Sequence, residues 1–167
     1  MINKIYIDLD GVLADFEGQY QQLFGKHPRD AGDEETWKRI LQYEDAGNCW
    51  FLDLPKMKNA EKLWNYITNL SGVTVVILSA TGHNYEEHGS HKKTWSKKHF
   101  KVKDKDVIVV RKSKLKGEYG NEESILIDDS PRSINAFIEN GGIGILHTSV
   151  DDTLNKLKVM FGNAGIV

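Results

Sequence analysis

Short runs of apolar, mostly β-branched residues recur along the chain and predict the strands of a buried sheet. The five runs cover residues 5–7, 73–79, 106–110, 124–128 and 143–147. Most of them lack alternating polar positions, which is typical of strands covered on both faces. Parallel sheets are covered in this way, so the runs predict a mostly parallel sheet.

Helix signals separate these runs. Asn59 is expected to cap a helix that ends before Gly72, and Ser130 followed by Pro131 is expected to begin another. Residues 149–161 have the pattern of a closing helix with acidic residues in its first turn. This alternation of strands and helices predicts an α/β fold with a doubly wound, Rossmann-like sheet.

Residues 15–58 interrupt the alternation, because they contain no convincing strand. Residues 16–25 and 34–47 carry helical patterns instead. We therefore expect a small helical cap, inserted after the first strand and lying over the sheet. The core domain would consist of residues 1–14 and 59–167.

Composition narrows the class of protein without naming a function. The 167 residues suit one domain with a small inserted subdomain. A net charge of −2 gives no general attraction to nucleic acid or to an anionic membrane. No apolar run approaches the ~20 residues of a membrane helix, and no signal-peptide pattern is present. The single cysteine, Cys49, excludes an internal disulfide and fits a reducing compartment, so we expect a cytoplasmic protein. The oligomeric state stays open, a homodimer included.

Carboxylates follow two of the predicted strands. Asp8 and Asp10 come directly after the first run, and Asp128 and Asp129 close the fourth. Ligands of an open parallel sheet bind beyond the carboxyl ends of its strands, so these side chains are expected to converge. Because crowded carboxylates raise one another's pKa, they favour a hard divalent cation with oxygen ligands, Mg²⁺ above all.

A lone Asp-x-Asp after a strand is more often a turn or a helix cap than a catalytic motif. Two further features of the sequence favour the catalytic interpretation over a turn or a helix cap. Ser79 ends another predicted strand, where a hydroxyl and the following N–H groups suit a phosphate. A basic stretch, residues 111–116, follows the third strand. Carboxylates, a hydroxyl and a lysine at one sheet edge favour phosphoryl chemistry.

The residues resemble a known family. The stretches "DLDGVLADF", "ILSATG", "RKSKLK" and "LIDDSP" are similar, in the right order, to the four motifs of the haloacid dehalogenase superfamily of phosphotransferases. The likeness is strongest to its 5'(3')-deoxyribonucleotidases, whose entry to a helical cap resembles "DGVLADFEGQY" and whose return to the core resembles "CWFLDLPKMKNAEKL". This resemblance implies a Mg²⁺-dependent phosphomonoesterase that acts on nucleoside monophosphates.

The resemblance also implies roles for the carboxylates. Asp8 would be the nucleophile that forms an aspartyl-phosphate, and Asp10 would be the general acid and then the general base. The metal ion would take Asp8, the backbone carbonyl of Asp10 and the pair Asp128 and Asp129. Within that pair, local likeness favours Asp129 as the direct ligand.

The phosphate-binding position falls on Ser79 and the N–H of Ala80, with Thr81 beside them. This chain has Ala80-Thr81-Gly82 where the family usually has Ser-Pro after the serine. The pocket for phosphate and sugar is therefore expected to differ here.

The lysine of the third motif would steady Asp8 and the transferring phosphoryl group. Lys114 is the first choice, and Lys112 and Lys116 remain alternatives. For each of them alone, a solvated surface charge is the commoner outcome.

Aromatic cap residues would stack on the base of the substrate. Phe16 and Trp37 are the positions that we expect in this role, with Trp50 and Phe51 as further candidates. A plain core role is at least as common for Trp37, Trp50 and Phe51.

Two polar stretches invite other interpretations. His83, His88 and His91 suggest zinc, but their spacing fits no ligand pattern, and a loop beside the site is expected instead. The basic stretch 92–105 is expected to be a solvated helix face.

Three other functions compete with the nucleotidase. One is a 3'-phosphatase for nucleic-acid ends, like the phosphatase domain of polynucleotide kinases. A helical cap argues against it, because such caps close over small substrates, so nucleic acid is not expected as a partner. The others are a silent nucleotide-binding module and a phosphatase for sugar phosphates.

Overall fold

The five predicted strands form one parallel sheet. The computed structural model describes residues 1–162; residues 163–167, the end of the expected core segment, lie outside the described part. The strands are β1 (Lys4–Ile7), β2 (Thr74–Ala80), β3 (Val107–Val110), β4 (Ser124–Asp128) and β5 (Ile143–Leu146). Their order is β3-β2-β1-β4-β5, and each neighbouring pair is parallel. The predicted doubly wound α/β fold is confirmed.

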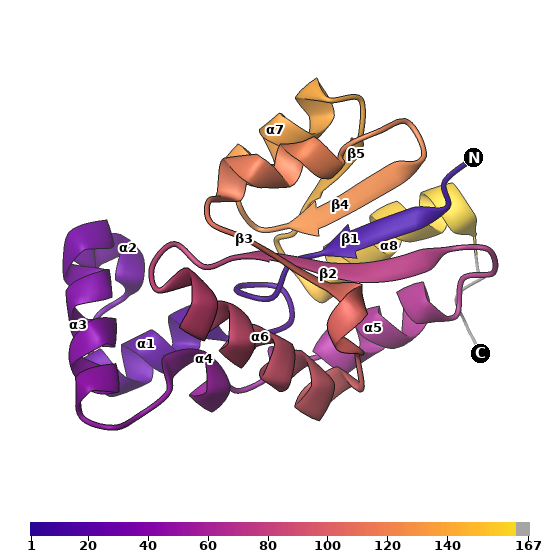
Figure 1. The fold of residues 1–167 in the computed structure, drawn as a ribbon. Helices are drawn as coiled ribbons and strands as arrows, with labels where there is room; N and C mark the ends of the chain where they lie inside the picture. Colours follow the sequence, from indigo (N-terminus) through magenta and orange to yellow (C-terminus); the bar gives the residue numbers. More distant parts are fainter. Residues whose placement is uncertain (163–167) are drawn as a thin grey trace.

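Helices cover both faces of this sheet (Figure 1). The core helices are α5 (Ala60–Thr68), α6 (Tyr85–Phe100), α7 (Pro131–Glu139) and α8 (Val150–Phe161), with the 3-10 helices η1 (Asp104–Asp106) and η2 (Ser113–Tyr119). The expected caps are only partly as predicted. Ser130 accepts a hydrogen bond from the Ser133 N–H, whereas Asn59 precedes α5 with a left-handed backbone and makes no side-chain cap bond.

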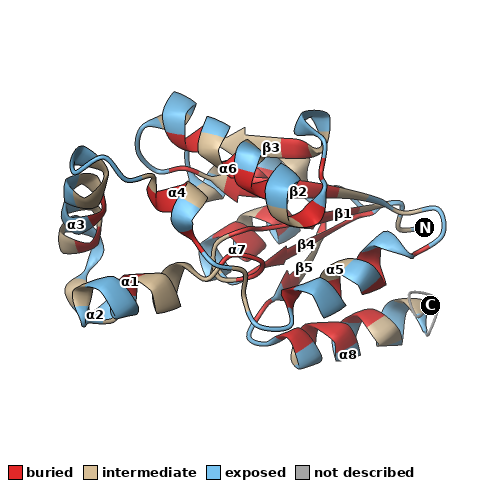
Figure 2. Cartoon of the chain, turned by 90° about the horizontal axis from the view of Figure 1, so that it is seen from below, coloured by how far each residue is buried: buried red, intermediate tan, exposed pale blue. Residues whose placement is uncertain are grey.

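The side chains of β1 pack alternately into two hydrophobic cores, because successive side chains of a strand point to opposite faces. Ile5 and Ile7 are buried in the larger core with α5, α8 and the base of the cap. Tyr6 points to the other face and packs in the smaller core with Ile134 and Phe137 of α7. Figure 2 shows that the central strands β1, β2 and β4 are mostly buried, whereas the edge strands β3 and β5 are largely intermediate.

A helical insertion follows β1, as the sequence predicts. It contains α1 (Phe16–Phe24), α2 (Pro28–Ala31), α3 (Asp33–Asp45) and α4 (Trp50–Asp53), and it lies beyond the carboxyl ends of the strands (Figure 1). Its two connections to the core run side by side: the Asp15 N–H donates to the Pro55 carbonyl, and the Met57 N–H donates to the Leu13 carbonyl. The division of the chain at residues 15–58 remains a prediction.

The histidine-rich stretch differs from the expected loop. His88 and His91 lie within α6, and only residues 81–84 form an irregular connection after β2. No helix in residues 1–162 is both long enough and apolar enough to cross a membrane.

Candidate active site

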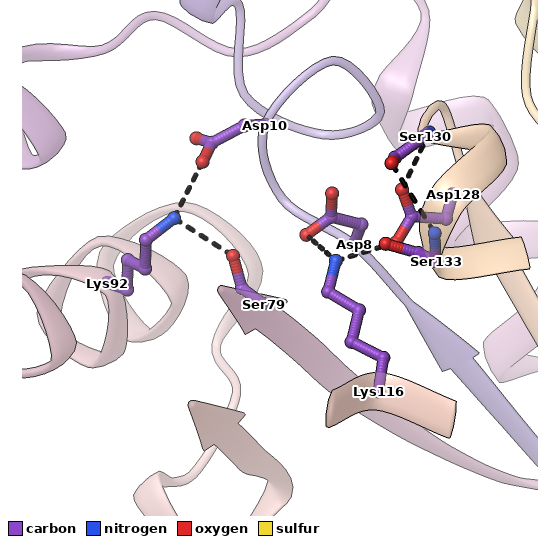
Figure 3. Close-up of polar contacts among 8 residues, drawn as sticks. All are labelled: Asp8, Asp10, Ser79, Lys92, Lys116, Asp128, Ser130 and Ser133. Atoms are coloured by element: carbon purple, nitrogen blue, oxygen red, sulfur yellow. Dashed lines mark hydrogen bonds and ion pairs between the residues drawn. The ribbon is translucent and has the colours of Figure 1, made fainter. Parts of the chain in front are cut away.

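Asp8 lies where β1 ends, and it is almost completely buried. Its Oδ1 is 3.0 Å from Nζ of Lys116, and the same Nζ donates to Oδ2 of Asp128 at 2.6 Å (Figure 3). Lys116 is itself buried, and a buried lysine requires such partners. Burial lowers the pKa of Lys116, but the charges of Asp8 and Asp128 outweigh that effect and raise it. The ammonium therefore stays charged between the two carboxylates.

The contact between Lys116 and Asp8 shows that the prediction of Lys114 as the lysine of the third motif is wrong. Lys114, the first choice from the sequence, is exposed at the cleft and makes no ion pair with the described residues. Lys116, which the sequence kept as an alternative, is the lysine that reaches Asp8. The basic stretch forms the 3-10 helix η2, which packs on α7, and this packing turns Lys116 inward.

Asp129 completes a cluster of three carboxylates. Ligand oxygens of Asp8, Asp128 and Asp129 all lie within 4.8 Å of one another, and in residues 1–162 they are the group with metal-ligand geometry. Asp128 already uses both oxygens, on Lys116 and on the Ser130 N–H. Asp129 accepts no hydrogen bond from the described residues, so its carboxylate is free for a cation.

The carboxylates of the cluster carry an excess of negative charge. Asp129 lies at the exposed edge of the cluster, where partial desolvation, followed by the negative charges of Asp8, Asp128 and Asp10, raises its pKa to about 8. Burial and then Asp8 raise the pKa of Asp128 to about 6. The donor set consists entirely of carboxylate oxygens, which Mg²⁺ prefers, so these residues fit the expected magnesium site.

Gly11 allows the Asp129 carboxylate to lie close to the backbone that follows β1. Its φ of +80° favours glycine, and a Cβ there would lie 2.0 Å from Oδ2 of Asp129. The loop closes tightly, because the Gly11 N–H donates to the Ala14 carbonyl and the Ala14 N–H to the Leu9 carbonyl. Glycine therefore brings the chain after β1 against the carboxylate that follows β4.

Asp10 faces a second buried lysine, which the sequence analysis missed. Nζ of Lys92 donates to Oδ2 of Asp10 at 2.7 Å and to Oγ of Ser79 at 2.9 Å (Figure 3). The same ammonium lies 4.2 Å from the ring centre of Phe51. Lys92 was expected on a solvated helix face; this expectation is wrong, because α6 packs against α4 and covers it.

The remaining oxygen of Asp10 is available for chemistry. Oδ1 is buried and has no hydrogen-bond partner among the described residues. Burial raises the pKa of Asp10, although the adjacent Lys92 opposes the shift. A carboxyl group with a raised pKa and one free oxygen suits proton transfer.

Two adjoining cavities open above these groups. The smaller, about 240 Å³, is lined by Asp8, Asp10 and Lys116 among others. The larger, about 460 Å³, shares Asp10, Phe16 and Ala80 with it and continues beneath the cap. The larger cavity has the size that small-molecule sites have in proteins.

Of the four aromatic residues considered for stacking on a base, three line the larger cavity and one lies in the hydrophobic core. Phe16, Trp37 and Phe51 line the larger cavity, while Trp50 is fully buried and packs edge-on against Phe16. Gly82, which departs from the family pattern, has a φ of +73°, and a Cβ there would lie 3.1 Å from the ring of Trp37. The glycine lets this cap residue lie directly against the connection that follows β2, residues 81–84.

Ser79 and Thr81 are buried at the end of β2, and Ala80 lines both cavities. Ser79 already accepts a hydrogen bond from Lys92.

His88 contacts the cap, since its Nε2 lies 3.0 Å from both carboxylate oxygens of Glu44. That pairing, and not a zinc cluster, is what the structure gives for the histidine stretch.

Sequence comparison decides the family. The model for the 5' nucleotidase, deoxy (pyrimidine), cytosolic type C proteins (NT5C) matches residues 1–156. The chain belongs to this family. It is therefore a nucleotidase-family hydrolase of the haloacid dehalogenase type, and its cluster of Asp8, Asp128 and Asp129 is consistent with a Mg²⁺ site. No curated protein sequence matches this member of the NT5C family.

Solved structures agree with the fold of this NT5C-family chain. A haloacid dehalogenase-like family hydrolase from Xanthomonas campestris is 13% identical, with a TM-score of 0.62 over 98% of this chain and 94% of that one. A hydrolase from Streptococcus pneumoniae TIGR4 is 15% identical, with a TM-score of 0.58 over 94% and 98%. L-2-haloacid dehalogenase from Xanthobacter autotrophicus is 11% identical, with a TM-score of 0.54 over 94% and 82%. At these identities the likeness concerns the fold alone.

Proposed function

We propose that the protein is a magnesium-dependent phosphomonoesterase that removes phosphate from nucleoside monophosphates, deoxyribonucleotides first. The observation that carries the proposal is the arrangement after β1: Asp8 is held by Lys116 beside an unengaged Asp129, and Asp10, which has one unpaired oxygen, lines the same cavity. The family match and the aromatic wall of the adjoining cleft support a nucleotide as the substrate.

Asp8, Asp129 and the backbone carbonyl of Asp10 would hold Mg²⁺, with Asp128 fixed behind them by Lys116. When bound, the ion neutralises negative charge on the phosphate, so that an anionic nucleophile can approach it. Lys116 contributes a second fixed positive charge at the nucleophile.

Every bond that forms or breaks in the reaction joins atoms of this chain, the substrate or one water molecule. A carboxylate oxygen of Asp8 forms a bond to phosphorus, the bond from phosphorus to the alcohol oxygen breaks, and Asp10 gives its proton to that oxygen. Water next attacks phosphorus, Asp10 takes the proton of the water, and the bond to Asp8 breaks to release inorganic phosphate. Lys92 keeps Asp10 oriented through both steps.

A cytoplasmic location is part of the proposal. It is supported by the word "cytosolic" in the family's description and by the single, free cysteine, Cys49.

The test is phosphate release with Mg²⁺ from a panel of 5'- and 3'-nucleoside monophosphates, a sugar phosphate and a 3'-phosphorylated oligonucleotide. We expect release from the mononucleotides that disappears in Asp8→Asn and on addition of a chelator. Asp8→Asn is nearly isosteric, so its fold can be checked by circular dichroism. Release from the oligonucleotide alone would assign the protein to end processing. No release from any compound by the folded protein would refute the nucleotidase assignment.

A further inference from the structure

The larger cavity has a basic wall that one phosphate group does not explain. Four side chains of this wall carry positive charge: Arg111, Lys112, Lys114 and Arg132. None of them forms an ion pair or a side-chain hydrogen bond with any residue of the described range, 1–162. The whole chain, by contrast, has a net charge of −2.

The cations that serve the reacting phosphate are different ones. Lys116 is neutralised by Asp8 and Asp128, and Lys92 is paired with Asp10. Both are buried, whereas the basic wall is exposed to the cleft. The wall is therefore an additional positive region beside a reaction centre whose two buried lysines are already paired with carboxylates.

The fold brings the wall together from two distant segments. Residues 111–114 follow β3 at the edge of the sheet, and Arg132 lies in the first turn of α7, after β4. They meet because η2 docks on α7 so closely that a Cβ at Gly117 would lie 2.7 Å from the Ala136 carbonyl oxygen. Arg111 is also oriented, since its guanidinium lies 4.1 Å from the ring centre of Tyr85.

An aromatic wall lies on the other side of the same cavity. Phe16, Trp37 and Phe51 form it, and Asp10 and Ala80 connect the cavity to the reaction centre. A nucleotide whose phosphate reaches Asp8 would have its base available to the aromatic wall. Its sugar would then lie beside the basic wall, which attracts a further anionic group on that sugar.

We propose that the preferred substrate carries a second phosphate group on the sugar, as in a nucleoside 3',5'-bisphosphate, and that the basic wall binds the phosphate that is not removed. This inference rests on the proposed phosphomonoesterase activity and narrows its substrate class. A small bisphosphate is favoured over a polynucleotide, because the cavity holds about 460 Å³ and the cap residues Phe16, Trp37 and Phe51 form part of its wall.

The experiment compares kcat/KM for thymidine 3',5'-bisphosphate with the values for thymidine 5'- and 3'-monophosphate. We expect a preference of about tenfold for the bisphosphate at low salt, which corresponds to about 1.4 kcal/mol. The preference should shrink as salt is added, because the wall is exposed. Arg111→Gln and Arg132→Gln should each reduce the preference about threefold or more, whereas Lys158→Gln on α8, with the same loss of charge, should keep it.

Binding separates this inference from the proposed function. The Asp8→Asn protein, titrated calorimetrically with both compounds, should bind the bisphosphate more tightly than the monophosphates even if it releases nothing. Equal affinity and equal kcat/KM would overturn the second phosphate site, while activity on monophosphates would leave the phosphatase intact. A 3'-phosphorylated oligonucleotide with a higher kcat/KM than the bisphosphate would overturn the assignment to a small substrate.

Discussion

At the scale of single residues, each of the two buried lysines contacts one of the carboxylates that we propose to be catalytic. Lys116 lies against Asp8, and Lys92 lies against Asp10 and Ser79. Removing such a partner leaves a buried carboxylate without compensation, which costs more than the net value of the bond itself.

Lys92→Met tests this arrangement with a side chain of similar length and no charge. We expect kcat to fall about 10- to 100-fold, because a hydrogen bond to a charged group is worth about 1.5–3 kcal/mol. Phosphate release under saturating substrate is the measurement. Lys93→Met, one residue along the same helix and only partly buried, is the matched control. Equal losses in both variants would contradict a specific role for Lys92.

His147 makes stability depend on pH. Burial, and to a lesser extent Lys156, lowers its pKa, although Asp152 opposes the shift, and its Nδ1 lies 2.7 Å from Oγ1 of Thr153. The folded protein thus binds a proton less readily than the unfolded chain, whose histidine titrates near 6.5. The stabilisation is complete above that pH and is lost as the pH falls through 6.5 towards the folded-state pKa.

The check is urea unfolding of wild type and His147→Gln between pH 8 and pH 5. Wild type should lose more free energy of unfolding over this range than the variant does. Identical slopes in the two proteins would show that other groups account for the pH dependence.

At the scale of elements, the loop between β1 and α1 brings the carboxylates of two strands together. Gly11 permits both the positive φ and the approach of Asp129. Gly25, which ends α1, has a similar φ of +68°, but no atom lies within 4 Å of a Cβ placed there.

The pair Gly11→Ala and Gly25→Ala separates backbone strain from contact. Both should lose about 1–2 kcal/mol of stability, because an L residue adopts the left-handed conformation at that cost. Only Gly11→Ala should also weaken Mg²⁺ binding, since its Cβ displaces Asp129. Calorimetric Mg²⁺ titration and urea unfolding measure the two effects. Unchanged Mg²⁺ affinity in Gly11→Ala would argue against Asp129 as a ligand.

At the scale of the whole molecule, several contacts join the cap to the core. They include the paired connections around Asp15 and Met57, the packing of α4 on α6, and the contact of Glu44 in α3 with His88 in α6. Trp37 is stacked on His88, with ring centres 6.2 Å apart, so this contact also positions an aromatic residue of the cleft.

Glu44→Ala should loosen the cap, because it leaves the fully buried His88 ring without its partner. We expect a loss of about 1–3 kcal/mol in stability and a rise in KM that exceeds any fall in kcat. Glu34→Ala, at an exposed position of the same helix, provides the control. An unchanged KM in Glu44→Ala would separate the cap contact from substrate binding.

The sequence alone determined the sheet, the helical insertion and the identity of the carboxylates. These features depend on local information: apolar runs define β1, β2 and β4, and connectivity places Asp8, Asp10, Asp128 and Asp129 at the strand ends. Parallel strands then bring those ends to one edge, whatever the details of packing.

Only the tertiary structure decided which lysines face the site. Lys116 turns inward because η2 docks on α7, and Lys92 is covered because α4 packs on α6. Both contacts join segments far apart in the chain, so no local pattern distinguishes these lysines from the solvated Lys112 or Lys93. A charged side chain is buried where distant partners compensate it, and that compensation exists only in the folded molecule.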